Sequence, residues 1–524
     1  MIPNTSSLLG FFFYIDEINL RHLATSVWLF AVGVVLGLLA TALLWALLLA
    51  ISPKKLGGRC TAALTGPALM PISVVMGIWA FLALALLPMV PNSMEILNSL
   101  KQIPTTGEST YEVIVPIASG DVDKRGNVPA TPLDIVLLTD QMRTMKINST
   151  GKVELVARLA DSDDDVVTYD IGGGELFEWR RGDRGTLLRK IPNGETIELY
   201  ARNITNSDIK LEVSLLTEPE HIEAESIFFI GTLVFLLYGT YFAMVCVFPK
   251  MSAIAEATVR SEIYQLLFLI CAIVGCLFMV ASIYIPYQTF GEDIKVLKHT
   301  CLQAMMVLGI VVAIWAASRS VSEEIEGRTA LTLLSKPVSR RQFVLGKFFG
   351  IAWLVSVLFV MISSVFVVSV AQKPIFDKRE GATMEFEGEK GITWQLLHHE
   401  AMSVTPGVLL VYMETLVLAG VSVAISTRLP MVANFMLTFG IWALGHLTPS
   451  IMEASVEGFE PVQFVAGFVA TILPVLKNFE IYGAISAGRE IPLTYIAGTA
   501  LYTILYGAMT MFLALILFED RDLA

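Results

Sequence analysis

A long succession of apolar stretches constrains this chain more than any other feature. Runs such as residues 23–51 and 493–518 are each long enough to cross a hydrocarbon layer of about 30 Å. Of the 524 residues, 55% are hydrophobic and only 16% are charged, which is typical of membrane proteins with many spans. The chain is therefore predicted to be a mainly α-helical polytopic membrane protein.

Nine apolar runs are predicted to be transmembrane helices. They cover residues 23–51, 64–90, 227–248, 263–285, 300–317, 348–370, 406–426, 432–448 and 493–518. Basic residues gather on alternate loops, and the positive-inside tendency makes those loops cytoplasmic. The residues concerned are Lys54, Lys55, Arg59, Lys250, Arg260, Arg428 and the basic residues between Arg319 and Lys347. This pattern predicts a multi-pass protein of the cell (inner) membrane, with its N-terminus outside and its C-terminus in the cytoplasm. No basic segment precedes the first long run, so no cleavable signal peptide is expected.

The one large water-soluble segment, residues 92–225, is predicted to be an inserted extracytoplasmic β-rich domain. Apolar and polar residues alternate in YEVIVPI, VELVARLA, ETIELYA and IKLEVSLL, and glycine-containing turns lie between such runs. These strands predict a small antiparallel sandwich. The segment carries 24 acidic and 14 basic residues, so 14 − 24 = −10 of the net charge of −12 lies here. A basic nucleic-acid surface is therefore not expected. None of the five cysteines lies in this segment, so no disulfide is expected to stabilise it.

A strongly polar segment, residues 318–347, separates two of the predicted spans. It must lie in water, because charged groups are costly in hydrocarbon. A short helix is predicted over residues 329–335, with a bend at Gly327 before it and Pro337 ending it, and Ser339 can cap the helix that follows. The bend would turn this short helix roughly across the membrane normal. A helix in that orientation is suited to transmitting a push from a soluble partner. An amphipathic helix resting on the lipid surface is an equal alternative.

The run EIEGRTALTLLSKPVSRRQFVLGKF resembles the coupling region of ABC transporter permeases of the second exporter type, the ABC-2-like membrane-spanning proteins. The ending FEDRDLA is also similar to the usual end of that family, and the resemblance covers about residues 245–524. It implies an exporter-type permease that works with a separate ABC ATPase and assembles as a homodimer or heterodimer. The residues expected to couple to the ATPase are Glu323, Glu324, Glu326, Gly327, Thr329, Leu333, Leu334, Pro337, Ser339 and Arg340.

The apolar spans and the resemblance together predict a domain organisation, in which residues 1–225 and the third span are additions to the six core helices of the family's minimal members. Residues 1–91 would form an N-terminal segment with two transmembrane helices, and 92–225 the β-rich domain. Residues 226–262 would supply the third transmembrane helix and an interfacial elbow helix at 249–262. Residues 263–524 would form a six-helix permease core with the cytoplasmic coupling loop 318–347.

Enzymatic chemistry is not expected in this chain. The glycine-spaced stretch Gly483–Gly488 is followed by Arg489 and Glu490, where a phosphate-binding loop needs Lys and Ser or Thr. No catalytic, cofactor-binding or metal-binding residue set is predicted, and ATP with Mg²⁺ would be bound by the partner ATPase. The acidic run Asp161–Asp165 has oxygen ligands suited to Ca²⁺, although a solvated turn explains it more simply.

One carboxylate, Glu414, falls inside a predicted span. A buried acid normally faces a polar cavity or a partner, so Glu414 is predicted either to line a translocation pathway or to form a helix-packing hydrogen bond. Asn434 and His446 in the next span are expected to be packing or interfacial groups. His398 and His399 lack metal-ligand spacing and are expected at the surface. A second function class stays open, a membrane-anchored binding or sensing protein acting through residues 92–225.

Overall fold

The computed structural model describes most of the chain. The described residues are 16–117, 130–138, 141–159, 165–174, 176–180, 196–205, 207–287, 289, 292–324, 339–380, 391–455, 473–486, 488–489 and 491–519. The chain forms two compact units, one of residues 92–225 and the other of residues 1–91 together with 226–524. Each is considered by itself below.

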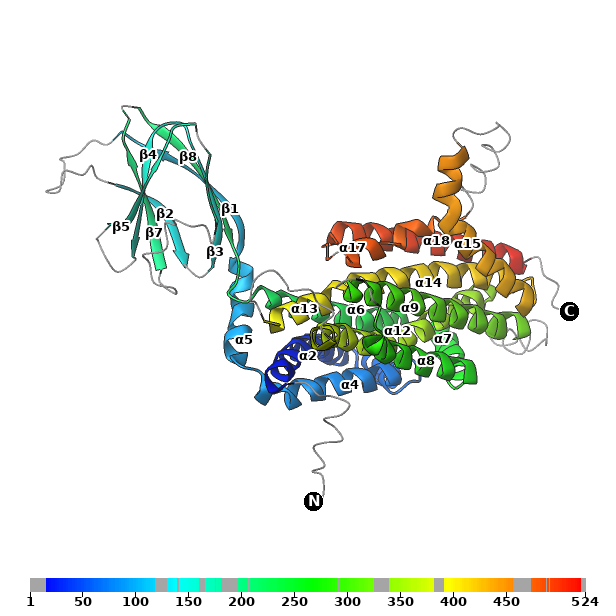
Figure 1. Ribbon diagram of the computed structural model, residues 1–524. Helices are drawn as coiled ribbons and strands as arrows, with labels where there is room; N and C mark the ends of the chain where they lie inside the picture. Colours follow the sequence, from blue (N-terminus) through cyan, green and yellow to red (C-terminus); the bar gives the residue numbers. More distant parts are fainter. Residues whose placement is uncertain are drawn as a thin grey trace, which may run out of the picture. The chain divides into compact units, whose positions relative to one another are not determined.

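In the part that is described, the unit of residues 92–225 contains eight strands after one short helix (Figure 1). The elements are α5 (Ser93–Gln102), β1 (Gly107–Val115), β2 (Thr131–Leu138), β3 (Met142–Ser149), β4 (Val153–Leu159), β5 (Asp165–Ile171), β6 (Leu176–Arg180), β7 (Thr196–Asn203) and β8 (Ile209–Thr217). They form two antiparallel four-stranded sheets, in the orders β1-β8-β3-β6 and β2-β7-β4-β5. The predicted antiparallel β-rich region is confirmed.

Both sheets bury their apolar residues in one shared core. In β8, Ile209, Leu211, Val213 and Leu215 are buried, and the residues between them are exposed or half-buried. Trp179 of the first sheet belongs to the same apolar cluster as residues of the second. All five cysteines lie outside this unit and are free thiols. The sandwich is therefore stabilised by the burial of alternate side chains and not by disulfides.

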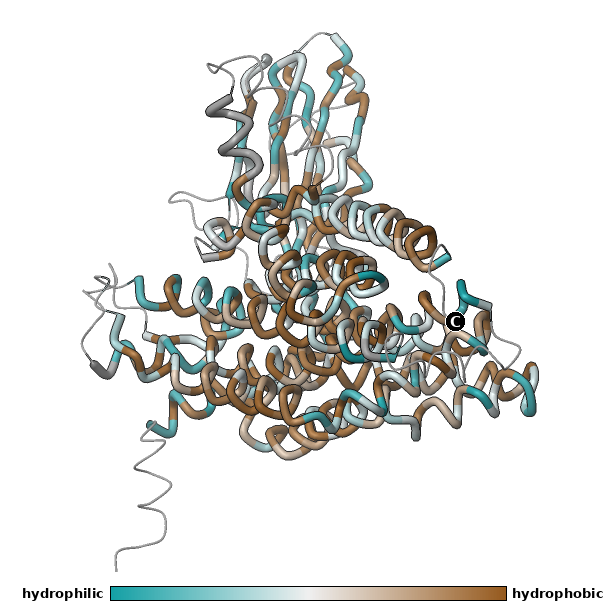
Figure 2. The backbone as a smooth tube through the Cα atoms, turned by 90° about the vertical axis from the view of Figure 1, so that its right-hand side faces the viewer, coloured by the Kyte–Doolittle hydropathy of each residue, from teal (hydrophilic) through white to brown (hydrophobic). Residues whose placement is uncertain are grey.

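The second unit is helical. Its helices are α2 (Glu17–Ile51), α3 (Gly58–Leu64), α4 (Met70–Ala85), α6 (Glu225–Val247), α7 (Pro249–Glu262), α8 (Leu266–Tyr284), α9 (Asp293–Ala317), α12 (Arg340–Glu380), α13 (Trp394–Ser403), α14 (Thr405–Ser426), α15 (Met431–Ser455), α17 (Tyr482–Ser486) and α18 (Leu493–Glu519). Hydrophobic residues dominate along these helices, whereas hydrophobic and hydrophilic residues alternate along the strands (Figure 2).

Seven helical stretches among the described residues are long and apolar enough to cross a membrane. They are Glu17–Ile51, Ile222–Val247, Leu266–Tyr284, Asp293–Ser322, Arg340–Lys378, Trp394–Ser426 and Leu493–Glu519. Two shorter apolar helices, Met70–Ala85 and Met431–Leu447, coincide with the predicted second and eighth spans. The predicted run 64–90 is broken because a turn containing Gly66 and Pro67 separates α3 from α4. With 16 residues, α4 is about 24 Å long, less than the hydrocarbon thickness of about 30 Å.

Helix α12 is the packing centre of this unit, in contact with α7, α8, α9 and α14. Figure 1 shows α9, α12 and α14 running side by side. Two glycines one helical turn apart, Gly346 and Gly350, lie where α12 meets α7. A Cβ atom at Gly346 would come within 2.8 Å of the Ile254 Cβ atom, and one at Gly350 within 2.7 Å of the Thr258 Cβ atom. The absence of side chains at these two positions permits the close approach of the helices.

Candidate functional site

The structure describes the two flanks of the predicted coupling segment, residues 318–347. Helix α9 continues through a π-helical stretch, Ser318–Glu323, as far as Glu324, and α12 begins at Arg340. The short helix predicted over residues 329–335 lies outside the described residues. The same applies to the side chain of Glu323 and to Glu326, Gly327, Thr329, Leu333, Leu334 and Pro337.

The downstream flank begins with a reciprocal helix cap. The backbone N–H of Gln342 donates to Ser339 Oγ, and the backbone N–H of Ser339 donates to Gln342 Oε1, both at 3.2 Å. Two backbone donors at the start of α12 are thereby satisfied, an arrangement that stabilises a helix by about 1 kcal/mol. The prediction that Ser339 caps this helix is confirmed.

An ion pair joins the upstream flank to the downstream one. Lys347 Nζ lies 2.6 Å from Glu324 Oε1, and the Lys347 side chain is only 4% exposed. The same ammonium group lies 5.6 Å from the centre of the Phe343 ring. Glu324 therefore binds a cation of its own chain, and the last described turn of the α9 extension is held against the start of α12.

The end of α18 packs against the same turn of α12. Arg340 Nη1 donates to the backbone carbonyl oxygen of Glu519 at 2.8 Å, and its guanidinium lies 5.8 Å from the Phe518 ring centre. The Phe518 ring stacks on Phe343 with the ring centres 5.8 Å apart. The aromatic and charged residues at the end of α18 thus help to fix the beginning of α12.

A buried polar cluster attaches the end of α9 to α14 and α15. Asn434 Nδ2 donates to Ser318 Oγ and to Ser422 Oγ, each at 2.9 Å. The Ser322 hydroxyl donates to the backbone carbonyl oxygen of Leu429 at 3.0 Å. Asn434 is fully buried, so it is a packing group, as its position in the sequence predicts. The contacts of both flanks therefore involve α9, α12, α14, α15 and α18.

A second cluster surrounds Glu414, which is fully buried in α14. His446 Nε2 of α15 lies 3.4 Å from Glu414 Oε1, and His446 Nδ1 lies 3.1 Å from the backbone carbonyl oxygen of Trp442. Within the part of the chain that the structure describes, the carboxylate oxygens of Glu414 form no hydrogen bond of good geometry, although the Trp442 indole N–H also lies near the carboxyl group. A buried carboxyl group in this state is costly unless a proton, a cation or a ligand donor satisfies it. The cluster can accept one of these between two helices.

The comparison with protein-family models supplies the family. Residues 226–523 match the model of the ABC-2 family transporter proteins, which is more than half of the chain. The chain belongs to the ABC-2 transporter family. No curated protein sequence matches it significantly.

Family membership decides several properties of this ABC-2 permease. Permeases of the family lack an ATPase domain and carry no cofactor, so the chain is a multi-pass membrane component of a transporter and not an ATP-hydrolysing enzyme. ABC permeases generally pair with an ATPase. The matched region begins at residue 226, so the β-rich unit lies outside it.

Residues 249–262, which are predicted to be an interfacial elbow helix, form the helix α7 of this ABC-2 permease with the same bounds. Its buried residues include Met251, Ile254 and Thr258, which face the glycines of α12. Because α7 contacts the part of α12 that follows the capped start, it is another element in contact with the downstream flank of the coupling segment.

Three charged or polar groups were not recognised from the sequence as interior residues. His398, expected at the surface, is only 2% exposed; its Nε2 lies 2.7 Å from Ser226 Oγ, and its Nδ1 lies 3.3 Å from the backbone oxygen of Ser26. The surface prediction is wrong for His398, because α13 packs against α2. Lys373 is fully buried and lies 3.0 Å from Asp377, and Lys298 pairs with Glu400. The spacing of Lys373 and Asp377, four residues apart on one helix, is the signal that could have revealed them.

Proposed function

We propose that this ABC-2 permease is the membrane-spanning subunit of an ATP-driven exporter. A separate ABC ATPase would bind the segment between Gly327 and Ser339. The observation that carries the proposal is the anchoring of both flanks of this segment within the family-matched region. A load applied to the segment would reach α9 through Glu324 and α12 through Ser339 and Lys347.

The orientation follows from the basic residues. Lys54, Lys250, Arg319, Arg340 and Arg428 belong to loops or helix ends that the positive-inside tendency assigns to the cytoplasm. The coupling segment is then accessible to a cytoplasmic ATPase, and residues 92–225 are extracytoplasmic. Two permease chains, identical or different, would face a pair of ATPase subunits, whose closure on ATP moves the two coupling segments.

The Glu414 cluster would lie on the translocation pathway. If His446 donates its Nδ1 proton to the Trp442 carbonyl oxygen, its Nε2 lone pair faces the Glu414 carboxyl. A proton shared between these two groups, or a cationic part of a substrate, would satisfy both. Repacking of α14 against α15 during the ATPase cycle would then expose the cluster alternately to the two sides.

Pull-down from cells tests the docking site. The affinity-tagged permease is expected to co-purify with an ABC ATPase. The substitutions Glu326→Lys and Leu334→Asp are each expected to reduce recovery of the ATPase at least tenfold. Glu292→Lys is the matched control, because Glu292 precedes α9 at the end remote from the coupling segment and its side chain is 61% exposed. Undiminished recovery with both test variants would refute the docking assignment.

Cysteine labelling tests the pathway. In a chain whose five native cysteines are replaced, Glu414→Cys is expected to react with a small charged thiol reagent, and the rate is expected to change when ATP is added with a hydrolysis inhibitor. Ala419→Cys is the control, because Ala419 is also fully buried on α14 but, five residues from Glu414, lies on a different face of the helix. Equal labelling at the two positions would show that Glu414 is a packing group.

The second candidate function is binding or sensing by the β-rich unit. It is favoured by one observation, that residues 92–225 form a compact unit with an apolar core of their own. Deletion of residues 107–217 separates the candidates. If the chain is an exporter that needs only its family-matched region, the shortened chain is expected to keep both ATPase association and export. If its function is sensing by the β-rich unit, the shortened chain is expected to assemble but to lose its response.

A further inference from the structure

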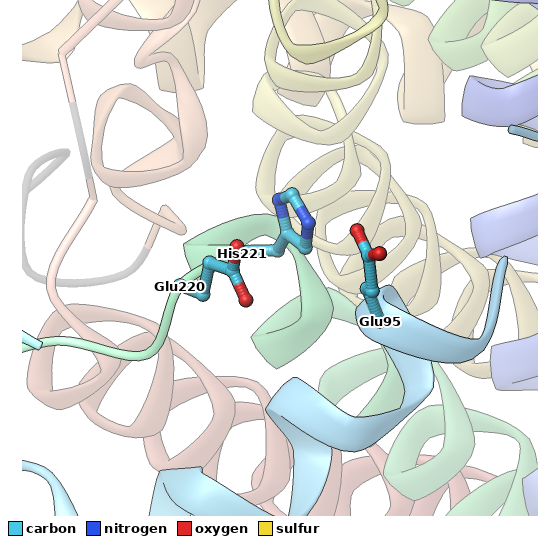
Figure 3. Close-up of side chains that lie close together, drawn as sticks. All are labelled: Glu95, Glu220 and His221. Atoms are coloured by element: carbon cyan, nitrogen blue, oxygen red, sulfur yellow. The ribbon is translucent and has the colours of Figure 1, made fainter. Parts of the chain in front are cut away.

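Three potential metal ligands converge within the unit of residues 92–225. Glu95 lies in the first turn of α5, and Glu220 and His221 immediately precede the short 3₁₀ turn Ile222–Ala224. One ligand atom from each residue lies within 4.8 Å of the others. Figure 3 shows the three side chains gathered between α5 and the segment that carries Glu220, with the Glu95 carboxylate facing the His221 ring.

The sequence positions of these residues give the cluster its place in the chain. Glu95 comes four residues after Pro91, where the chain enters the unit, and His221 comes five residues before Ser226, where it leaves. Glu95, Ser99 and Gln102 share one face of α5, since they are four and seven residues apart. The Gln102 side-chain oxygen on that face accepts a hydrogen bond from the backbone N–H of Glu220 at 3.4 Å. The first helix and the last segment of the unit are thus already joined by one hydrogen bond beside the cluster.

The charges at this place favour a cation. Among the described residues, no ion pair to a Lys or Arg is formed by the carboxylates of Glu95 and Glu220. By contrast, Glu218, two residues earlier on the same segment, pairs with Arg143 at 2.8 Å. Two like charges beside an imidazole are stabilised when a divalent ion lies between them.

The donor set selects the kind of ion. One imidazole nitrogen and two carboxylate oxygens form a ligand set that Zn²⁺ accepts, usually with water in the fourth position. Ca²⁺ and Mg²⁺ prefer six or more oxygen ligands and do not favour imidazole. In a tetrahedral zinc site the ligand atoms are about 3.3 Å apart, as follows from bond lengths of about 2.0–2.1 Å. Glu95 and Glu220 are both exposed, so their side chains have room to rotate toward this shorter spacing.

We propose that Glu95, Glu220 and His221 bind one Zn²⁺ ion, which joins the first helix of the β-rich unit to its last segment. The ion neutralises the two carboxylates and adds a cross-link to the Gln102–Glu220 hydrogen bond. The ion thereby links the segment through which the chain enters the unit to the segment through which it leaves, as a disulfide could do elsewhere. This proposal does not depend on the transport function.

Metal binding to the full-length chain tests the proposal. The protein carries a histidine-free tag, is purified in detergent, stripped with EDTA and dialysed against buffered Zn²⁺, and bound zinc is measured by atomic emission. We expect one zinc ion per chain in the unmodified protein. His221→Ala and Glu95→Gln each remove a ligand and are expected to weaken zinc binding at least about 100-fold. Loss of a residue that only hydrogen-bonds to a metal ligand already weakens binding by about 10–100-fold.

Matched variants make each outcome decisive. Glu95→His replaces one ligand with another and is expected to retain zinc, which separates loss of a ligand from loss of the fold. His399→Ala and Glu112→Gln change exposed residues of the same types elsewhere and are expected to bind zinc normally. Equal zinc binding by the unmodified protein and His221→Ala would identify adventitious binding only and overturn the proposal. Absence of zinc binding, or displacement of zinc by equimolar Ca²⁺ or Mg²⁺, would overturn it as well.

Discussion

The β-rich unit and the helical unit of this ABC-2 permease place their polar groups in opposite ways. In the β-rich unit the ion pair between Arg143 and Glu218 is at the surface, with both side chains 30% exposed. In the helical unit the ion pair between Lys373 and Asp377 is interior, with side-chain exposures of 0% and 10%. Conversely, large apolar side chains such as Phe81 and Phe512 are 69% and 66% exposed on the helices.

This difference follows from the solvent of each unit. In water, burial of apolar surface decides which face of a strand points inward, so the alternation in β8 determines its packing. In lipid, an apolar side chain gains little by turning inward, so small residues and buried polar contacts fix the helices relative to one another. In the helical unit the close approach of two helices depends on Gly346, and buried polar contacts are formed by Asn434 and Lys373. Substitutions at polar positions should therefore matter most in the helices, and substitutions at apolar positions should matter most in the sandwich.

The largest effect is expected from Asp377→Asn. Lys373 Nζ lies 3.0 Å from Asp377 Oδ1 and donates to the backbone oxygens of Ile283 and Ile285, each at 3.1 Å. Removing the carboxylate leaves a fully buried ammonium without its charge partner, which should destabilise the protein by about 3–5 kcal/mol. Thermal unfolding in detergent, followed by tryptophan fluorescence, should show a transition of the helical unit at a lower temperature.

The double variant with Lys373→Met and Asp377→Leu is the control for this prediction. It removes both charges and retains apolar volume, so its transition should return close to that of the unmodified protein. A double variant as unstable as Asp377→Asn would mean that packing at this site, and not the unpaired charge, dominates.

A comparable apolar substitution in the sandwich is Ile197→Ala, with the second-largest expected effect. Ile197 is fully buried in β7, which lies between β2 and β4 in its sheet. Truncating it leaves a cavity and removes buried methyl groups, at a cost of about 2–5 kcal/mol. The loss of strand signal in circular dichroism should move to lower temperature, whereas Ile504→Ala, at a helix position 67% exposed, should change stability little. Equal effects of the two substitutions would remove the contrast between the units.

Close helix packing gives a smaller effect of the same kind. Gly346→Ala places a Cβ atom 2.8 Å from the Ile254 Cβ atom and 3.1 Å from the Met251 backbone oxygen, so α7 and α12 must separate. The expected destabilisation is about 1–3 kcal/mol. Gly239→Ala on α6 is the control, because a Cβ atom there meets nothing within 4 Å, and the gain in helix propensity should stabilise by up to about 1 kcal/mol. Opposite shifts of the unfolding temperature are therefore expected, and shifts of the same sign would contradict close packing at Gly346.

The same contrast explains what the sequence could predict. The alternation of residues 209–216 predicts a strand, because one face of a sheet in water must be apolar. Hydropathy alone could not supply the sheet order, which depends on long-range contacts such as Met145 of β3 opposite both Leu215 and Trp179. Apolar length predicted where spans lie, but not where helices end. The predicted span 348–370 ends ten residues before α12 does, because Lys373 and Asp377 are buried together.

In the candidate site, too, a local pattern could be predicted from the sequence, whereas contacts between distant residues could not. The serine at 339 followed by Gln342 is a local pattern, so the cap could be predicted from the sequence. The partner of Glu324 is Lys347, on another helix and 23 residues away, and the partner of Glu414 is His446, 32 residues away. Such pairs depend on which helix faces meet, and nearly uniform apolar helices carry little periodic information about that.

The smallest effect is expected from Arg143→Ala in the sandwich. The guanidinium Nε lies 2.8 Å from Glu218 Oε2, a good hydrogen-bond distance, yet water reaches both partners. A pair of this exposure stabilises by less than about 1 kcal/mol, and 1 M salt should remove most of that. The shift in unfolding temperature should therefore be small at low salt and smaller at high salt, whereas the shift caused by Asp377→Asn should be independent of salt. A large, salt-insensitive effect of Arg143→Ala would show that the ion pairs of the two units do not differ in the way their exposures indicate.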